Sequence, residues 1–475
     1  MTHIAGDDRS QAVLLPDVLD DYVGPAHPVR FLDAFVAQLD LGGLGFQRAT
    51  AAETGRPGYH PGDLLRLYLY GYLHRIRSSR RLEQETHRNV ELMWLLRRLT
   101  PDFKTIADFR RDHPQALKGV GREFLLLCKR LDLFGGELLA IDGSKFRAVQ
   151  ARDRSFTPAR LTKLIATIDA TLAAYLRQLE AQDHREAAIT APTAAELQER
   201  IARLAPRRAR YDGFQQQLAA TGAGTLSLTD PDARPMVSGG TIEVGYTVQT
   251  AVDAKHKLIV AETVTNAAAD RAQLSPLALA AQAILEAPAP VVLADRGSYH
   301  GAEIKRGLEA GITPLVPRPR TSANAALGLF TKDDFRYDPG QDAYRCPAGE
   351  TLTARAATVE RGRHITYYRT AACRGCPLKA RCTRNRDGRR LTRWVDEHLQ
   401  DAMAERLRAY PQHARQRAAL VEHPFGTMKR GMDQGYFLLK GLAKVRGEFS
   451  LTVLAYNLKR VLNLVGVPRL LAAVA

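Results

Sequence analysis

The sequence predicts a mixed α/β protein in which a mixed sheet flanked by helices forms the middle of the chain. Three observations lead to this expectation. Short apolar, β-branched runs alternate with helical periodicity over residues 136–317. Helical periodicity alone dominates residues 28–120 and returns after residue 400. Residues 318–400 follow neither pattern and contain four of the five cysteines.

The first segment, residues 1–130, is expected to form a helical domain because apolar residues recur at intervals of three and four. Its stretch PDFKTIADFRRDHP predicts a short helix with a polar cap near Thr105. Such a domain could dock on a DNA duplex or dimerise, because no helix-turn-helix spacing is evident. The arginines that we expect to be exposed on it are Arg75, Arg77, Arg80, Arg81 and Arg88.

Residues 136–317 are expected to form the first part of the sheet. ELLAIDGSKFRAV predicts one strand, IEVGYTVQTAVD and KLIVAETVT predict a β-hairpin, and VVLAD and GITPLVPRP predict two further strands with helices between them. Sites in such sheets lie at the carboxyl ends of strands. We expect Asp142 and Asp295 at two of these ends.

Residues 155–225 interrupt this pattern and predict an inserted helical hairpin. Apolar residues from Leu161 to Leu179 follow one helical stripe, and Thr193 with Glu196 forms a capping box that opens a second helix. This hairpin is better explained by packing or by contact with a partner than by a catalytic role.

Charge is the most unusual feature of the composition. The 475 residues are 45% hydrophobic and 25% charged, which is ordinary, but the net charge is +17. Residues 345–394 hold thirteen Lys or Arg against three acids, and residues 75–111 hold ten against five. This distribution favours a nucleic-acid partner, although simple solubilisation by positive charge remains an alternative. Without a signal pattern or a long apolar span, we expect a cytoplasmic protein with no membrane contact.

Three acids lie in local motifs: Asp142 in LLAIDGSK, Asp295 in VVLADRGSYH and Glu422 in VEHPFGTMKR. Singly, each Asp is explained by a turn at a strand end, and Glu422 by an exposed helical position. Jointly, two strand-end acids and a helix-borne acid can converge on divalent metals. Arg415 and Lys429 lie seven residues to either side of Glu422 and could share its helix face, unless Pro424 kinks the helix.

These motifs, in this order, resemble the DDE transposases of bacterial insertion sequences. The segments SSRRLEQETHRNVELMWLL and PDFKTIADFR resemble the helical N-terminal domain of that family. The resemblance implies an RNase H-like core and metal-dependent cleavage at the element ends, followed by transfer of the 3′-OH into target DNA. It also implies double-stranded DNA as partner, a homodimer on DNA and a nucleoid-associated location in bacteria.

The same resemblance implies residue roles. Asp142, Asp295 and Glu422 would bind two Mg²⁺ or Mn²⁺ ions, and Lys429 matches the lysine that follows the glutamate by seven positions. The Tyr and Arg that often precede the glutamate are replaced here by Arg415 and Ala418, with Arg417 as a substitute for the arginine.

A metal-dependent nuclease of RNase H-like fold and a non-catalytic DNA-binding protein from a decayed element are the alternatives. Two further DNA contacts are inferred from proximity in sequence, namely Lys145 and Tyr299. Two other acids are kept out of the site, Asp253 as a turn residue and Asp270 as a helix cap.

The cysteines of residues 318–400 predict a basic, zinc ribbon-like insertion. The thiols of Cys346, Cys373, Cys376 and Cys382 suit a tetrahedral structural zinc site, and a metal would supply the stability that a small core lacks. Reduced, unliganded cysteines and an iron–sulfur cluster are alternatives. Cys128, in the apolar run FLLLCKR, is expected in the core. Residues 401–475 would complete the catalytic core with helices.

Overall fold

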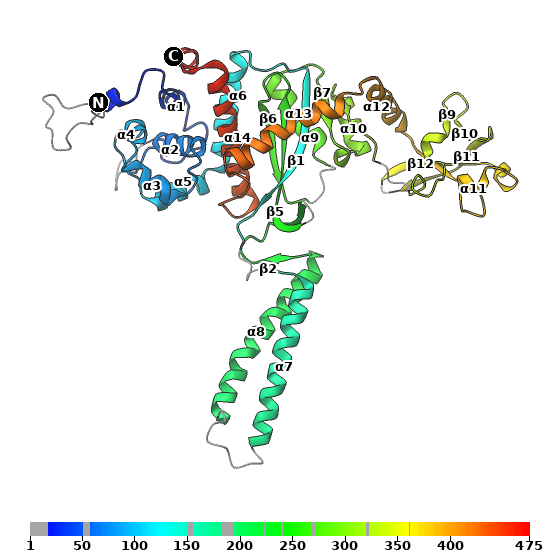
Figure 1. The fold of residues 1–475 in the computed structure, drawn as a ribbon, viewed down its shortest axis with the longest axis horizontal. Coiled ribbons are helices and arrows are strands. Elements are labelled where there is room, and N and C mark those ends of the chain that lie inside the picture. Colours follow the sequence, from blue (N-terminus) through cyan, green and yellow to red (C-terminus); the bar gives the residue numbers. More distant parts are fainter. Residues whose placement is uncertain are drawn as a thin grey trace, which may run out of the picture.

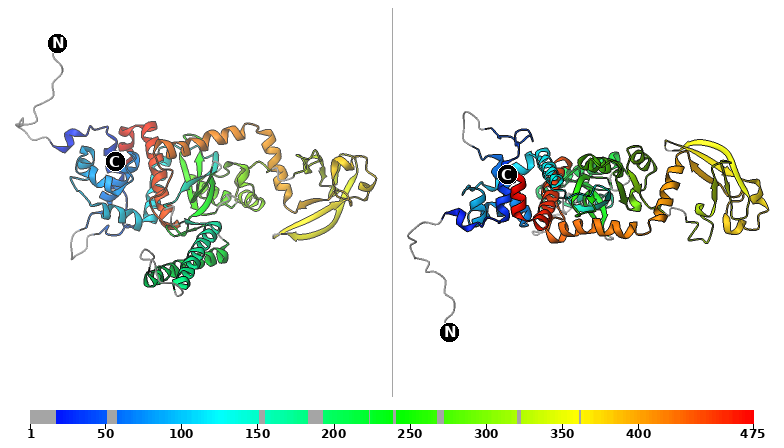
Figure 2. Two further views of the ribbon diagram at one scale, coloured as in Figure 1. Left: turned by 60° about the horizontal axis from the view of Figure 1, so that its bottom comes forward. Right: turned by 90° about the horizontal axis from the view of Figure 1, so that it is seen from above.

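The computed structural model describes residues 18–50, 58–150, 155–182, 193–222, 224–238, 241–267, 272–319, 323–360 and 362–475. An elongated body contains the N-terminal helices, the main sheet and the C-terminal helices (Figure 1). A helical hairpin and a small β-sheet leave this body in different directions, as the two further views in Figure 2 show. The predicted cap at Asp270 lies outside the described residues.

The N-terminal region is helical, as the sequence predicted. Its helices are α1 (Pro28–Ala37), α2 (Pro61–Leu73), α3 (Ser79–Thr86), α4 (Val90–Leu95), α5 (Phe103–Asp112) and α6 (Pro114–Arg130). Proline at the first position of α1, α2 and α6 costs no hydrogen bond there and presets φ for a helix. The cap of α5 is Asp102, whose carboxylate accepts the N–H groups of Lys104 and Thr105, and not Thr105 itself.

The main sheet is mixed. Its strands are β1 (Leu138–Arg147), β4 (Arg234–Ser238), β5 (Thr241–Asp253), β6 (Ile259–Thr265), β7 (Val291–Ala294) and β8 (Thr313–Leu315). The order is β4-β5-β1-β7-β8, and β6 also pairs with β5. Strands β1, β7 and β8 are parallel, whereas β5 is antiparallel to β1, β4 and β6. The sequence predicted each of these strands except the edge strand β4. Asp253, at the end of β5, accepts the N–H groups of Gly135, Gly136 and Lys255, in keeping with a turn role.

Helices cover both faces of this sheet. Helices α9 (Leu274–Leu285) and α10 (Gly301–Glu309) lie on one face, and α13 (His413–Gly426) crosses the other (Figures 1 and 2). Helix α12 (Glu397–Ala409) leads into α13, and α15 (Val467–Val474) ends the chain. Helix α14 (Leu442–Val465) is buried along most of its length because it packs between β6 and the helices α2 and α6. One hydrophobic core therefore runs from the N-terminal helices through the sheet, and it includes Cys128, as predicted.

A buried ion pair ties the N-terminal helices to α14. The Arg77 guanidinium donates to the Glu448 carboxylate at 2.9 Å and to the carbonyl oxygens of Asp433 and Tyr436. Arg77 was predicted to be exposed for DNA contact, and this prediction is wrong, because only 5% of the residue is accessible. The carboxylate and the two carbonyl oxygens compensate a charge that could not otherwise be buried. The other four predicted arginines are exposed, namely Arg75, Arg80, Arg81 and Arg88.

The helical hairpin consists of α7 (Pro158–Gln182) and α8 (Ala194–Thr221), as the sequence predicted. The capping box is present, since Thr193 Oγ1 accepts the Glu196 N–H and the Glu196 carboxylate accepts the Thr193 N–H. At its base, β2 (Ser155–Phe156) pairs with β3 (Leu226–Ser227), and a small core joins Phe156, Leu161 and Leu218. Helix α7 has fewer core contacts than its stripe suggested, since Leu176 remains exposed.

The small β-sheet has its own core. Its strands are β9 (Arg336–Asp338), β10 (Ala343–Arg345), β11 (Thr351–Glu360), β12 (Arg363–Arg369) and β13 (Leu391–Trp394), paired antiparallel in the order β13-β12-β11-β10-β9. The core of this sheet contains five buried residues, Phe335, Tyr344, Leu352, Tyr368 and Leu391. Such a core contributes little stability compared with the main one. Among the described residues of the whole chain, no helix is both long and apolar enough to cross a membrane.

Candidate active site

Asp142 and Asp295 emerge side by side from neighbouring parallel strands. The last paired residues of β1 and β7 are Ile141 and Ala294, and each aspartate is the next residue. Strand β1 continues beyond this point and stays paired with β5, so its edge toward β7 opens at Asp142 and is met again only by a bridge between Arg147 and Tyr436. The sequence placed Asp142 at a strand end, but it lies inside β1. It is instead the pairing with β7 that ends there, which gives the opening expected at the carboxyl end of a parallel pair.

The Asp142–Gly143 dipeptide is not a turn, although that was the simplest interpretation of the sequence. Gly143 lies opposite Gln249 of β5, and a β-carbon on Gly143 would come within 2.6 Å of the Gln249 side-chain amide nitrogen. A larger residue at this position would therefore force the Gln249 side chain to move. The Gly143 N–H donates to Asp142 Oδ1 at 2.8 Å, which fixes one oxygen of the carboxylate.

Asp295 is held by the turn that follows β7. Its Oδ1 accepts hydrogen bonds from the backbone N–H and the hydroxyl of Ser298, both at 3.2 Å, and so caps the short 3₁₀ helix η3 (Arg296–Ser298). The side chain is half-buried. The turn thus fixes the direction in which the second carboxylate leaves the sheet.

Helix α13 supplies a cation to this pair of acids. Arg417 Nη1 donates to Asp142 Oδ2 at 2.6 Å, and the two side chains are 21% and 24% exposed. The helix packs against β1, β5 and β7 through Leu420, Val421 and Phe425, which are buried. Sequence reasoning named Arg417 as a substitute DNA-binding arginine but did not predict its ion pair with Asp142, because the partners are 275 residues apart.

Burial governs the charge state of Asp142. Desolvation raises the pKa of its carboxyl above the ordinary value, and the negative charge of Asp295 adds to the rise. Arg417 and the Gly143 N–H oppose the rise without cancelling it. The influence of Asp295 shows that the two carboxyl groups are electrostatic neighbours. A bound cation would relieve the repulsion between them.

Glu422 lies on the same helix but does not join the two aspartates. It is exposed, and at 100° per residue it sits about 140° around the helix from Arg417. Within the described residues, no three His, Cys, Asp or Glu side chains lie close enough together to hold a metal ion. The structure therefore brings together Asp142, Asp295 and Arg417, and it places Glu422 on the element that covers them.

The proline after Glu422 does not end the helix. Helix α13 continues through Pro424 to Gly426, and the irregularity comes later, as the π-helical turn η6 (Thr427–Gly431). That turn directs Lys429 over the Phe146 ring, with Nζ 5.0 Å from the ring centroid, and burial there lowers the pKa of Lys429. The expected common face of Arg415, Glu422 and Lys429 is therefore not formed, since Arg415 is exposed while Lys429 is half-buried against β1.

The remaining predicted DNA contacts point elsewhere. Because side chains alternate along a strand, Lys145 leaves the face of β1 opposite to that of Asp142, and its Nζ donates to Thr247 Oγ1 at 2.7 Å. The hydroxyl of Tyr299 accepts from Arg318 Nε at 3.2 Å, and burial raises the pKa of Tyr299. These hydrogen bonds hold Lys145 against β5 and Tyr299 against Arg318.

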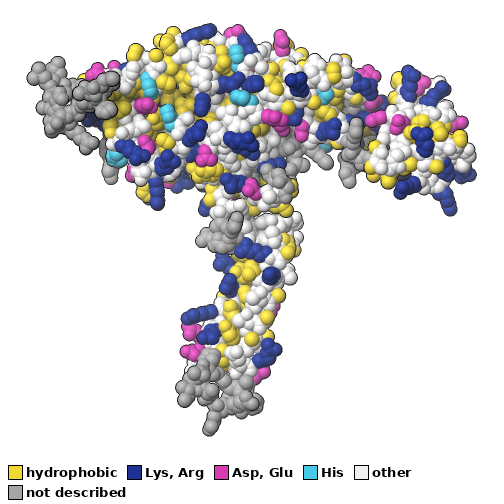
Figure 3. Space-filling view, in the orientation of Figure 1, with side chains coloured by type: hydrophobic (Ala, Val, Ile, Leu, Met, Phe, Trp, Pro, Cys, Tyr) yellow, Lys and Arg dark blue, Asp and Glu magenta, His cyan; other side chains and the backbone are white. Residues whose placement is uncertain are grey.

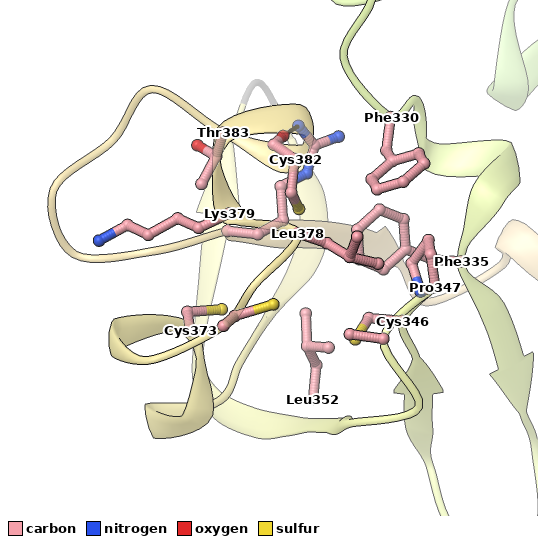
Figure 4. A pocket seen from close by; sticks show the side chains of 13 residues that line it. Phe330, Phe335, Cys346, Pro347, Leu352, Cys373, Leu378, Lys379, Cys382 and Thr383 are labelled. Atoms are coloured by element: carbon pink, nitrogen blue, oxygen red, sulfur yellow. Dashed lines mark hydrogen bonds between the residues drawn. The ribbon is translucent and has the colours of Figure 1, made fainter.

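The four predicted zinc ligands line one cavity in the small β-sheet. Cys346 follows β10, Cys373 and Cys376 flank a turn, and Cys382 ends the short helix α11 (Lys379–Cys382). Figure 4 shows Cys373, Cys382 and Cys346 around the same space as Leu352 and Phe335. The cavity has a volume of about 20 Å³, room for one or two water-sized species. All four cysteines are free, so no disulfide joins them. Among the described residues, they do not form a group of three or more side chains that could hold a metal ion as they stand.

The walls of this cavity carry positive charge. Burial raises the pKa of the Cys382 thiol, whereas Arg389 opposes the rise and the other three cysteines add to it. Arg389 stacks on Phe335, and its Nε is buried without a hydrogen-bond partner among the residues that the structure describes. Gly388 has a φ of +98°, and a β-carbon there would lie 2.4 Å from Cys373 Cβ. The loop is thus closed tightly over the cysteines, with a guanidinium facing them.

Two family models match the chain. A model described as "Transposase DDE domain" matches residues 345–462, and one described as "Transposase domain (DUF772)" matches residues 17–112. The first includes α13 with Glu422 and the cysteine cavity, and the second covers helices α1 to α5. Asp142 and Asp295 lie between the two matches. No curated protein and no solved structure matches the chain. The two transposase models, matched at opposite ends of one chain, indicate a DDE transposase of the insertion-sequence type.

Proposed function

We propose that the protein cuts DNA at the ends of its insertion sequence and transfers the freed 3′-OH into target DNA. The observation that carries this proposal is the ending of the β1–β7 pairing at Ile141 and Ala294. Asp142 and Asp295 then emerge together beneath α13, the helix that carries Glu422. A mixed sheet with β5 antiparallel to β1 and with β7 and β8 parallel to it supports an RNase H-like core.

The acids suit hard divalent cations. Carboxylate oxygens are the donors that Mg²⁺ and Mn²⁺ prefer, and Asp142 and Asp295 supply them from fixed backbone positions. Asp142 and Asp295 would hold two such ions, whose chemistry would be to activate the attacking oxygen and to stabilise the leaving one. Glu422 would complete the ligand set by turning its exposed side chain toward the sheet, or through a rotation of α13.

Arg417 has two successive roles in this proposal. In the metal-free protein it neutralises Asp142 through the 2.6 Å ion pair. Once the carboxylate holds a metal, the same guanidinium is free to bind a phosphate oxygen of the scissile strand. Arg415, exposed two residues earlier on α13, would contact the DNA backbone from another side of the helix. Lys429 would reach DNA only by leaving its position over Phe146.

We propose that the cysteine cavity binds a structural Zn²⁺. Four thiols lining one small space match the donor set of tetrahedral zinc sites. Four thiolates with Zn²⁺ carry net negative charge, and the buried Nε of Arg389 would complement it. The small core of this sheet gains from such a metal, because five buried residues hold it together.

The domain roles follow from these assignments. Residues 1–130 would form a DNA-binding or dimerising helical domain, and residues 136–317 with 401–475 the catalytic core. Residues 318–400 would form the zinc-binding insertion, whose exposed basic residues bind double-stranded DNA as a homodimer assembles on it. The basic side chains of the small sheet are visible in the space-filling view (Figure 3).

The test uses the full-length protein, Mg²⁺ and DNA that carries the ends of its own element. Cleavage followed by joining is expected, and Asp142→Asn, Asp295→Asn or Glu422→Gln should each reduce both by on the order of 10³-fold. The matched control is Glu405→Gln, which removes an exposed helical acid on α12 and should leave both reactions unchanged. Cutting without joining would indicate a nuclease, and tight binding without cutting would indicate a DNA-binding protein.

A further inference from the structure

The hairpin of α7 and α8 carries a stripe of arginines for which the proposed chemistry has no use. Four of them follow one side of α8 at intervals of three, four and three residues, and all four are exposed. They are Arg200, Arg203, Arg207 and Arg210. The apolar residues of α8, such as Leu197 and Leu218, are buried against α7 instead. The stripe therefore runs along the exposed flank of α8, beside the packing surface of the hairpin.

Acids neutralise only some of the arginines on this helix. Arg203 pairs with Glu199, and Arg208 pairs with Asp169 and Asp212. In the described part of the chain, no acid pairs with Arg200, Arg207 or Arg210. The hairpin that carries these three charges projects from the body (Figures 1 and 3).

Aromatic rings fix two of these three guanidinium groups. Arg207 lies 5.6 Å from the Tyr211 ring centroid and donates from Nε to the Tyr211 hydroxyl at 3.1 Å. Arg210 lies 5.3 Å from the Phe214 ring centroid. Tyr211 and Phe214 are partly buried and pack against the core at the base of the hairpin. Stacking on anchored rings reduces the entropy that each arginine loses on binding, and it leaves the other N–H groups free to donate.

We propose that this stripe is a contact surface for the sugar-phosphate backbone of duplex DNA outside the catalytic site. From Arg200 to Arg210 the helix rises about 15 Å, and a DNA strand presents a phosphate about every 3.4 Å along its axis. Guanidinium groups at this spacing bind phosphates without reading sequence. The inference rests on the proposed function only in taking DNA as the partner.

The test measures binding of a fluorescent duplex without element ends, in EDTA, from 50 to 300 mM salt. Each phosphate contact adds about 0.9 to the slope of log K against log salt. The variant Arg200→Gln/Arg207→Gln/Arg210→Gln should therefore lower the magnitude of this slope by up to about 2.7 and weaken binding at low salt. Glutamine keeps helix propensity, and circular dichroism checks the fold.

The matched control removes the same charge from the body, as Lys255→Gln/Arg306→Gln/Arg469→Gln, at three exposed positions outside the hairpin and outside residues 1–130 and 318–400. Its slope should equal that of the wild type. An unchanged slope in the hairpin variant, an equal loss in the control, or a wild type that does not bind DNA would each overturn the inference. A changed oligomeric state with an unchanged slope would instead show that a second copy contacts the stripe. A wild type that binds DNA but does not cut it would contradict the proposed function and leave this inference unaffected.

Discussion

Arg417 Nη1 lies 2.6 Å from Asp142 Oδ2, and this ion pair joins α13 to β1 at the point where the pairing with β7 ends. In the metal-free protein, the Asp142 carboxylate, which would bind a metal, is therefore paired with the Arg417 guanidinium. Both side chains are largely buried, at 21% and 24% exposure. Metal binding at Asp142 must compete with this contact.

Replacing Arg417 by glutamine should tighten metal binding in the absence of DNA. Loss of an ion pair of about 1 kcal/mol corresponds to roughly 5-fold tighter binding. Titration with Mn²⁺, followed by the electron paramagnetic resonance signal of the free ion, measures the Kd. Arg415→Gln, two residues away and exposed, is the control and should not change it. Weaker binding in Arg417→Gln would mean that the arginine orients Asp142 for the metal.

Asp142→Asn should stabilise the metal-free protein at neutral pH while abolishing activity. Burial raises the folded-state pKa of Asp142 above its unfolded value of about 3.9. The folded state therefore binds the proton more tightly, so the stability contributed by this group is complete below the unfolded pKa and is lost as pH rises through the folded pKa. In EDTA, Tm of the variant should exceed that of the wild type at pH 7 and approach it near pH 4. A lower Tm at pH 7 would show that the Arg417 pair outweighs burial.

Local patterns in the sequence predicted most elements of this fold. Short apolar, β-branched runs predicted the strands β1, β5, β6, β7 and β8. Apolar residues recurring at intervals of three and four predicted the helical hairpin and the N-terminal helices. Strand β4 was not predicted because its sequence, RPMVS, contains a proline. It forms the edge of the sheet, where pairing with β5 decides the conformation. The Asp142–Gly143 pair was assigned to a turn because turn propensity is local, whereas Gln249 comes from another strand.

The site was harder to predict because it depends on contacts between distant residues. The motifs pointed to Asp142 and Asp295, and the register of β1 and β7 makes them neighbours. Nothing in the spacing around Glu422 shows that Arg417 faces Asp142, or that Arg77 is buried against Glu448. Long-range ion pairs of this kind leave no periodic signal, since each partner looks like an ordinary surface charge in its own helix.

Arg77→Met should destabilise the protein by about 3–5 kcal/mol, because it leaves the Glu448 carboxylate buried without its cation. Chemical denaturation that reports on the whole body measures the change in the free energy of unfolding. Arg75→Met removes an exposed arginine two residues away and should cost less than about 0.5 kcal/mol. The double variant Arg77→Met/Glu448→Gln should recover part of the loss. Equal effects of Arg77→Met and Arg75→Met would contradict a structural role for the pair.

The protein should be purified with about one Zn²⁺ per chain, measured by elemental analysis, and Cys376→Ser should lose it. Cys128→Ala is the control, because Cys128 lies in the main core and should not affect the metal content. Removal of the metal should unfold the small sheet alone, because its five-residue core is separate from the main core. Trp394 of β13 is one of two tryptophans, so its emission in a Trp94→Phe background reports on that sheet. A chelator should shift this emission while the helical circular dichroism of the body persists. Stoichiometric metal retained in Cys376→Ser would exclude the cysteine cavity as its site.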